Sequence, residues 1–489
     1  MVASSYVWQE TLCRETKAPF CTFIIFGASG DLAGRKLFPA LHTLHKRKLM
    51  HPESRIIACA RHPYDTESFR EKIFSLLSRN LSGQEAVLHP FLEKITYCVL
   101  DYSRAEDFIA LGKRLPDTGL RIFYLALPSS LYTETIRNLS RNGLLAEDPD
   151  RRRKCLAVFE KPFGLDLDSF HALDKALKVF LREDQIYRID HYLGKETVQN
   201  IFLLRFANRI FEPVWNRDHI DSIQITVSET LGVENRAGYF DKTGILCDMF
   251  QNHLLEMLSL VTMECPRQFT ADAVRDEKVK LIRSIRPPEP EDAVRAQYES
   301  YRSEKGIDRN SRTETFACMR LFIDSWRWQA VPIYLRAGKK LAEQATEIHI
   351  LFKTVPYSIF PGIDKEDLTR NVLHLSIQKQ EAMALTLHAK KPGPKLCMGS
   401  LTLCYDHSAG ETEYPDAYAR LLLDCQQEDQ TLFVRSDVIE SSWELFQGLL
   451  NSWKKESPHA IPLYKDGSDG PEESAALLRA DGRKWILLH

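Results

Sequence analysis

The chain has 489 residues and a formal net charge of -2, and 44% of its residues are hydrophobic. This length favours two domains, the composition is typical of a soluble globular protein, and the balanced charge argues against a general nucleic-acid binder. No apolar stretch reaches the length of a membrane span, the first twenty residues lack a signal-peptide pattern, and the eleven cysteines include no CxxC pair, so we expect reduced thiols in the cytoplasm.

The first two hundred residues alternate short apolar segments with longer amphipathic ones. The apolar segments are rich in Ile, Val, Phe and Tyr on both faces, as expected of strands buried between helix layers. They cover residues 21–27, 55–61, 95–101, 121–128 and 155–162. Helix-length segments lie between them, such as residues 37–50 and 167–183. This alternation predicts an α/β domain over residues 1–198, with a tail over 1–18, a doubly wound parallel (Rossmann-like) sheet, and ligands at the carboxyl ends of its strands.

The pattern changes after about residue 200. Alternating apolar and polar residues predict strands with one buried face, in an α+β domain over residues 199–489 that has a large antiparallel sheet. These strands are expected at residues 221–230, 346–353, 371–380, 382–391 and 399–407. A long apolar helix is expected over residues 244–264. The polar, proline-bearing residues 283–311 are expected to form a surface excursion.

A glycine-bearing turn follows the first predicted strand. Gly27 and Gly30, in FIIFGASGDLAGRKL, would allow close backbone approach, and the helix that follows would offer amide donors to a pyrophosphate. The spacing GxxGxxA departs from the usual GxGxxG, so an ordinary strand–helix turn is the alternative. The second strand ends in Arg61, where an NAD enzyme usually carries an acidic residue. An arginine suits the 2′-phosphate of NADP, and the alternative is a solvated surface arginine.

Several motifs are similar to those of the glucose-6-phosphate dehydrogenase family and occur in that family's order. They are GASGDLAGRKLFPAL, EKPFG, RIDHYLGKE, RFANRIFEPVWNRD, GYFDKTGILCDMFQNHLLEM and YLRAGKKL. RIDHYLGKE is highly specific, whereas the glycine loop is not. The resemblance implies oxidation of D-glucose 6-phosphate to 6-phospho-D-glucono-1,5-lactone with hydride transfer to NADP. That reaction is the first oxidative step of the pentose phosphate pathway.

The resemblance assigns the proton transfer to two residues. His253 of QNHLLEM matches the family's base, and histidine suits this task because its pKa lies near working pH. Taken alone, a histidine on an apolar helix is more often a hydrogen-bonded core residue. Asp190 of RIDHYLG matches the carboxylate that orients the base and stabilises the imidazolium.

The resemblance also implies how the sugar phosphate is held. The matching substrate positions are Lys161, His191, Tyr192, Lys195, Glu229, Asp248, Lys339 and Gln344. The residues of HYLGK supply cationic and hydrogen-bonding groups for a phosphate dianion. The carboxylates of Glu229 and Asp248 accept hydrogen bonds from the sugar hydroxyls. Gln344 departs from the family, which usually has Lys or Arg there. Whether Lys340 compensates for the missing charge is left open.

The positions matched to coenzyme contacts come from several predicted strand ends. They are Gly27, Ser29, Gly30, Asp31, Leu32, Arg61, Asp101, Tyr102 and Lys161, with Leu127 and Pro128 as further lining residues. Lys161 matches a residue placed between coenzyme and substrate, and Pro162 is expected to follow a cis peptide bond. We therefore expect the two domains to meet around a phosphosugar.

The expected partners follow from the same resemblance. They are glucose 6-phosphate and NADP, with NAD as a weaker alternative. No metal, nucleic acid or membrane is expected. A homodimer or homotetramer in the cytoplasm is expected. Two other functions are kept as alternatives: a different NAD(P)-dependent sugar oxidoreductase, and a catalytically inactive NADP-binding regulator.

Overall fold

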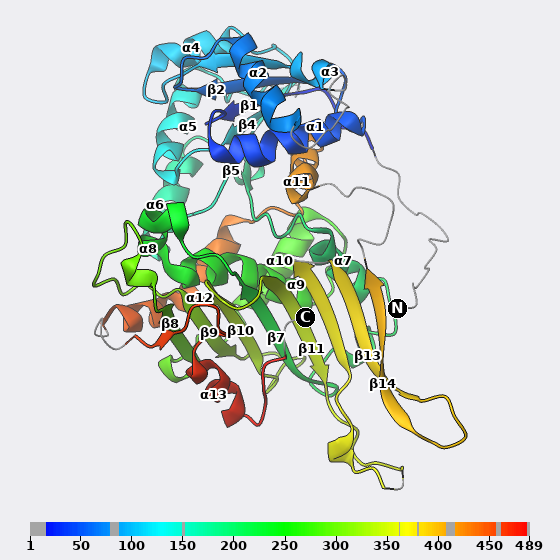
Figure 1. The fold of residues 1–489 in the computed structure, drawn as a ribbon. Coiled ribbons are helices and arrows are strands. Elements are labelled where there is room, and N and C mark those ends of the chain that lie inside the picture. The colour runs from blue at the N-terminus through cyan, green and yellow to red at the C-terminus, as the bar shows by residue number, and fades with distance from the viewer. Residues whose placement is uncertain are drawn as a thin grey trace.

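The computed structural model of the chain contains two β-sheets, each with its own covering helices (Figure 1). It describes residues 16–78, 88–148, 152–360, 362–378, 381–406, 416–455 and 461–486. Most of the predicted N-terminal tail, residues 1–15, lies outside this described part. None of the helices within these ranges has the length and apolar character needed to cross a membrane.

The first sheet is parallel and has the strand order β3-β2-β1-β4-β5-β6. Its strands are β1 (Cys21–Phe26), β2 (Arg55–Ala60), β3 (Ile95–Val99), β4 (Gly119–Leu125), β5 (Arg153–Phe159) and β6 (Ile186–Arg188). The five predicted strands and the doubly wound fold are confirmed. The short strand β6 was not predicted. The strand order reverses between β1 and β4, which is the switch point where such sheets bind dinucleotides.

Helices cover both faces of this sheet. They are α1 (Phe38–Lys46), α2 (Thr66–Leu77), α3 (His89–Leu92), α4 (Ala105–Gly112), α5 (Tyr132–Arg141) and α6 (Leu167–Lys178). Phe38 of α1 and Phe69 of α2 belong to the core on one face, whereas Phe108 of α4 and Tyr132 of α5 belong to the core on the other. Asp65 caps the start of α2, because its side chain accepts a hydrogen bond from a first-turn amide.

The second sheet has nine strands in the order β14-β13-β12-β11-β7-β10-β9-β8-β15. They are β7 (Ile220–Ser228), β8 (Ala293–Tyr298), β9 (Phe316–Leu321), β10 (Ile333–Gly338), β11 (Ala345–Phe352), β12 (Val372–Gln378), β13 (Ala382–Lys390), β14 (Met398–Asp406) and β15 (Leu463–Tyr464). The sheet is mixed rather than wholly antiparallel, because β7 pairs with β10 in parallel. The surface excursion predicted over residues 283–311 is wrong in its middle, since β8 lies there and buries Ala296 and Tyr298.

Helices pack against one face of the second sheet (Figure 1). The longer helical elements after β6 are α7 (Glu196–Phe206), α8 (Ala237–Ile245), the π-helical segment η8 (Leu246–Leu254), α9 (Leu255–Thr262), α10 (Ala271–Ile282), α11 (Ala417–Gln426), α12 (Ser436–Lys455) and α13 (Glu472–Ala480). Of these, α13 lies on the other side of the sheet (Figure 1). The opposite face of the central strands was predicted to be open. It is instead covered by the chain after α13: the Gln224 side chain on β7 donates to the Lys484 carbonyl at 2.9 Å.

Segments distant in sequence join the two sheets. Helix α11 comes late in the chain, yet it packs against α1 and β4 of the first sheet (Figure 1). Strands β5 and β6 lead directly into Lys161 and Asp190, and both residues contact η8 of the second unit. Helix α7 spans the predicted boundary at residues 198 and 199, and that boundary stays a prediction.

Candidate active site

His253 lies on η8, which is wound more widely than an α-helix. The segment follows Gly244, whose φ of 66° interrupts α8 and where a Cβ would lie 2.3 Å from Glu314 Oε1. That oxygen accepts a hydrogen bond from the Leu246 amide at 3.1 Å and so caps the new segment. A π-helix pairs residue i with residue i+5, so Asp248 and His253 lie one turn apart on the same side.

Three titratable side chains form a hydrogen-bonded chain between the two sheets. Asp190 Oδ1 lies 2.5 Å from His253 Nδ1 and also accepts from the Tyr192 amide at 2.9 Å. Lys161 Nζ donates to His253 Nε2 at 2.7 Å and to the Asp248 backbone oxygen at 2.9 Å. In this arrangement Nδ1 of the imidazole carries the proton that Asp190 accepts, and Nε2 presents a lone pair.

Burial dominates the electrostatics of this group. Burial lowers the pKa of His253 well below its ordinary value, and the positive charge of Lys161 lowers it further. Burial raises the pKa of the Asp190 carboxyl group, and the charges of His191 and Lys161 oppose that shift. A neutral imidazole held by a carboxylate is therefore available to take a proton from a bound hydroxyl group.

Two further carboxylates and a second lysine lie beside this chain. Glu229 follows β7 and Lys339 follows β10, and the parallel pairing of these strands lets Lys339 donate to Glu229. Lys339 Nζ also lies 3.8 Å from Asp248 Oδ2. Burial alone would raise the pKa of Asp248, but Lys161, Lys339 and Arg236 together lower it to about 2. Asp248 is therefore an anion at neutral pH and can accept hydrogen bonds from sugar hydroxyls.

The residues of HYLGK form a polar wall next to His253. The rings of Tyr192 and His253 stack with centroids 4.2 Å apart, and the His191 ring centroid lies 4.7 Å from that of His253. Lys195 Nζ lies 4.1 Å from the centroid of the Tyr192 ring and donates to Gln378 Oε1 at 3.3 Å. Burial lowers the pKa of Lys195 to about 8. Gln378 was not predicted, because only the pairing of β12 within the second sheet brings it here.

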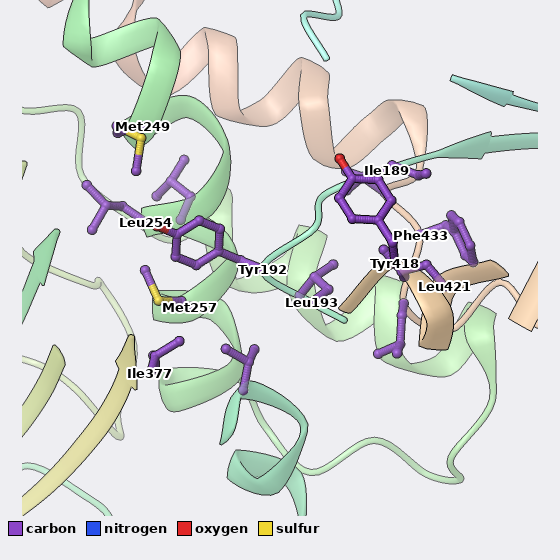
Figure 2. Close-up of a cluster of buried hydrophobic side chains, with 14 of the residues drawn as sticks. Ile189, Tyr192, Leu193, Met249, Leu254, Met257, Ile377, Tyr418, Leu421 and Phe433 are labelled. Atoms are coloured by element: carbon purple, nitrogen blue, oxygen red, sulfur yellow. The ribbon is translucent and has the colours of Figure 1, made fainter. Parts of the chain in front are cut away.

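Apolar packing fixes the segment that carries this wall. Figure 2 shows Tyr192 and Leu193 between two groups of helices, with Met257 of α9 on one side and Tyr418 of α11 on the other. Both Tyr192 and Leu193 are buried. The polar side chains of His191 and Lys195, on either side of this pair, therefore project from a backbone that packing holds in place, which is the condition for precise substrate positioning.

The predicted coenzyme positions converge at the carboxyl end of the first sheet. Gly27 has a φ of 78°, and a Cβ there would lie 2.1 Å from the Ala126 carbonyl oxygen, so only glycine fits this turn. The Gly27 amide donates to the Tyr102 hydroxyl at 3.1 Å, and the Arg61 guanidinium lies 6.0 Å from the centroid of the Tyr102 ring. The Gly30 amide closes the turn by donating to the Gly27 carbonyl at 2.9 Å.

The other predicted coenzyme positions surround this turn. The Ser29 carbonyl accepts from a lysine of α2 at 3.1 Å, and Leu32 packs partly against the core. Asp31 is exposed and pairs with Arg35 at 3.3 Å. The Asp101 carboxylate accepts from the amide two residues further on at 3.0 Å. The turn thus has charged side chains at its rim.

The structure also shows the Lys161–Pro162 peptide bond, the Gln344 side chain and the carboxyl group of Glu160. The Lys161–Pro162 peptide bond is cis, as predicted. The Gln344 side chain reaches the Thr230 amide at 3.4 Å, next to the candidate carboxylate Glu229. Sequence reasoning missed Glu160, although it belongs to the EKPFG motif. Its carboxyl group accepts a hydrogen bond at 2.5 Å from a tyrosine of β4, and burial raises its pKa to about 6.

Comparison with known proteins agrees with this arrangement. Residues 24–200 match the family model described as glucose-6-phosphate dehydrogenase, NAD binding domain, and residues 202–486 match the C-terminal domain of the same family. The first match indicates a nicotinamide coenzyme.

Curated relatives and solved structures cover nearly the whole chain. Glucose-6-phosphate 1-dehydrogenase of Treponema pallidum is 40% identical over 94% of each chain, and the cytoplasmic isoform 5 of Arabidopsis thaliana is 40% identical over 96% of this chain and 92% of its own. A structure described as glucose-6-phosphate dehydrogenase in complex with its substrate glucose-6-phosphate is 35% identical, with a TM-score of 0.88 over 96% of this chain and 100% of that one. Because motifs, both sheets and both domain models agree along almost the full length, the chain belongs to the glucose-6-phosphate dehydrogenase family.

Proposed function

We propose that this protein oxidises D-glucose 6-phosphate to 6-phospho-D-glucono-1,5-lactone and transfers the hydride to NADP. The observation that carries the proposal is the buried hydrogen-bonded group of Lys161, His253 and Asp190, with distances of 2.7 and 2.5 Å, beside the carboxylate Asp248. This hydrogen-bonded group places a proton acceptor where a coenzyme domain and a sugar-binding domain meet.

The protein's own side chains account for the proton. His253 Nε2 takes the proton of the C1 hydroxyl, which on binding replaces the contact that Lys161 makes with this nitrogen. Asp190 keeps the Nδ1–H tautomer in place and stabilises the imidazolium as it forms. The nicotinamide, when bound, accepts the hydride that leaves C1. Lys161 stays within reach of the Asp248 backbone oxygen and separates the two ligands.

The remaining polar groups orient the sugar phosphate. Asp248 and Glu229 accept hydrogen bonds from ring hydroxyls, with Lys339 holding both carboxylates in place. Lys195 and His191 contact the phosphate dianion. Burial lowers the pKa of both residues, and the negative charge of the phosphate favours their protonated forms. Holding the sugar at both ends fixes C1 at His253, and such positioning contributes several kcal/mol to catalysis, on the order of 7–11 in well-oriented systems.

The preference for NADP rests on Arg61. The turn at Gly27 leaves no room for a Cβ. A pyrophosphate can approach the backbone closely only at a turn of this kind. Arg61 is exposed at the end of β2, the adjacent strand, where the adenosine ribose of a bound dinucleotide lies. A guanidinium there meets the 2′-phosphate with a planar fork of donors. NAD, which lacks that phosphate, is the weaker coenzyme.

The assembly and location belong to the same proposal. A homodimer or homotetramer in the cytoplasm fits the partly open second sheet, where Leu401 and Leu403 of β14 are 48% and 53% exposed. An apolar sheet face of this kind is commonly covered by another subunit. The Arabidopsis relative is named as a cytoplasmic isoform, which supports the location.

A direct assay tests the activity. The purified full chain, mixed with glucose 6-phosphate and NADP, should generate the NADPH absorbance band, and the variant His253→Asn should lower kcat by about 10²- to 10⁴-fold. An inactive regulator would bind NADP without turnover. A different sugar oxidoreductase would turn over another sugar faster than glucose 6-phosphate. Either result would reject the proposal.

The coenzyme preference needs its own measurement. Arg61→Ala should raise KM for NADP by about ten- to a hundred-fold, because a charge-assisted hydrogen bond is worth about 1.5–3 kcal/mol. KM for NAD should stay nearly unchanged. Parallel increases for both coenzymes would show that Arg61 supports the domain rather than the 2′-phosphate.

A further inference from the structure

A buried ion pair lies next to the hydrogen-bonded group of Lys161, His253 and Asp190. Lys278 Nζ on α10 donates to Glu256 Oε2 on α9 at 2.7 Å. The side chains of Lys278 and Glu256 are only 3% and 4% exposed. Glu256 follows His253 by three residues, a spacing that places two side chains on the same side of a helical segment. The ion pair is therefore about one helical turn from the base, and the proton transfer described above does not use it.

Glu256 and Asp190 also border a common space. Both residues line a narrow cavity of about 20 Å³. Asp190 uses Oδ1 for His253 and for the Tyr192 amide, whereas Oδ2 is buried and has no hydrogen-bond partner among the described residues. Hydrogen bonds therefore compensate only part of the negative charge of this carboxylate, and nearby cations have to stabilise the rest.

Lys278 is one of these cations. Burial raises the pKa of Asp190, and the positive charge of Lys278 is among those that oppose this shift. Burial also raises the pKa of Glu256, which Lys278 lowers and the negative charge of Asp190 raises further. The two carboxylates therefore repel each other, and Lys278 attracts both.

Other charged and titratable groups surround these carboxylates on the adjoining elements. They are Glu160 and Lys161 after β5, His191, Tyr192 and Lys195 after β6, Asp248 on η8, Arg275 on α10 and Tyr418 on α11. Arg275 lies one turn before Lys278, but its guanidinium donates to the backbone oxygens of residues 430 and 433 at 2.7 and 3.1 Å. Of these two cations of α10, Lys278 is the one that contacts Glu256.

We propose that Lys278 and Glu256 are positioning residues for the oxidation: Lys278 keeps Asp190 ionised, and Glu256 holds Lys278 in place. This inference rests on the proposed function, because it gives the ion pair a part in that proton transfer. A buried ion pair is weak evidence for stability, since apolar side chains of similar size often join two helices equally well. Its position beside a carboxylate that has to stay charged gives this pair a chemical role.

The two members of the ion pair act on the proton of His253 in opposite directions. Without the cation Lys278, the coupled side chains of Asp190 and His253 take up a proton at higher pH. Without the anion Glu256, they take it up at lower pH. One unit charge about 10 Å away, at an effective dielectric constant of about 20, shifts such a titration by about one pH unit. Below the acidic limb of the rate profile, that shift changes the rate about tenfold.

The test is the pH profile of kcat/KM for glucose 6-phosphate at saturating NADP, measured on the full chain. Lys278→Met should move the acidic limb to higher pH by about one unit, and Glu256→Gln should move it to lower pH. The double variant, which carries both substitutions and leaves neither charge unpaired, should return the limb to near its wild-type position. The substrate phosphate titrates with a pKa of about 6 in every variant, so the quantity to compare is the difference from the wild type.

Controls separate this role from a structural one. Lys280→Met removes a lysine of the same helix that is 65% exposed and pairs with Glu277 at 3.3 Å, and it should leave the limb unmoved. Lys278→Arg keeps the charge and should keep the wild-type limb, even where the larger side chain lowers the melting temperature. Thermal unfolding is measured for each variant in parallel. If Lys278→Met does not fold, Glu256→Gln and the double variant carry the test, because neither leaves a buried carboxylate without its cation.

Three results would overturn the inference. Limbs that stay in place while the melting temperature falls, or that move in the same direction for Lys278→Met and Glu256→Gln, would show that the pair only joins two helices. A limb of the double variant displaced as far as that of Lys278→Met would show that the charge of Glu256 has no part. Absence of glucose 6-phosphate turnover by the wild-type chain would reject the proposed function and this inference with it, whereas turnover with unmoved limbs would reject this inference alone.

Discussion

The charge on Asp190 can be removed with almost no change of shape. In the variant Asp190→Asn, the remaining oxygen can still accept from the Tyr192 amide and from His253 Nδ1, which lie 2.9 and 2.5 Å from Asp190 Oδ1 in the unsubstituted chain. The new amide group takes the place of Oδ2, which is buried and has no hydrogen-bond partner among the described residues. What the variant loses is the negative charge that faces the imidazolium formed during proton transfer.

The expected loss of rate follows from that charge. Two unit charges about 4 Å apart interact by about 4 kcal/mol at an effective dielectric constant of about 20. This energy corresponds to a loss of about 10³-fold in kcat, at about 1.4 kcal/mol for each factor of ten. If the amide turns its N–H toward Nδ1, the imidazole is held in the wrong tautomer and the loss reaches about 10⁴-fold. KM for glucose 6-phosphate should change little, because Asp190 does not contact the sugar.

The assay is steady-state formation of NADPH at saturating coenzyme, with thermal unfolding measured in parallel. The matched control is Asp424→Asn, which neutralises another buried carboxyl group, on α11, whose partner is Arg420 at 3.1 Å. Burial raises the pKa of Asp424 to about 7, so its neutral form is already accessible and its loss should leave kcat intact. A kcat for Asp190→Asn within tenfold of the wild type would refute the role of this charge in stabilising the imidazolium.

Two further predictions follow from the same site. Lys195→Ala should raise KM for glucose 6-phosphate and leave the weak turnover of free glucose unchanged, because only the phosphorylated sugar presents a dianion to the ammonium group; equal losses for both sugars would assign Lys195 a structural role. Burial is the largest cause of the lowered pKa of His253, and the positive charge of Lys161 is the next. Lys161→Met removes that charge, so the pKa of His253 should rise. Since the base works only when deprotonated, the acidic limb of the kcat/KM profile should then move to higher pH, and an unmoved limb would show that Lys161 does not tune His253.

The sequence alone determined the local architecture and the chemistry of the individual residues. Segments that are apolar on both faces predicted the five principal strands of the parallel sheet. Each such strand is buried between helix layers, and this burial requires apolar residues on both of its faces. The turn at Gly27 was recognisable because its backbone conformation admits only glycine. The motif RIDHYLGKE indicated the family, and with it the candidate roles of Asp190 and His253.

Only the tertiary structure decided how these residues meet. On an α-helix Asp248 and His253, five residues apart, would point about 140° from each other, and the π-helical winding of η8 is what aligns them. Glu314, a residue distant in sequence, caps the start of this segment after Gly244. The contact of Lys161 with His253 was likewise invisible in the sequence. Periodicity encodes which face of an element is buried, whereas strand order and register, set by the whole core, determine which side chains come together.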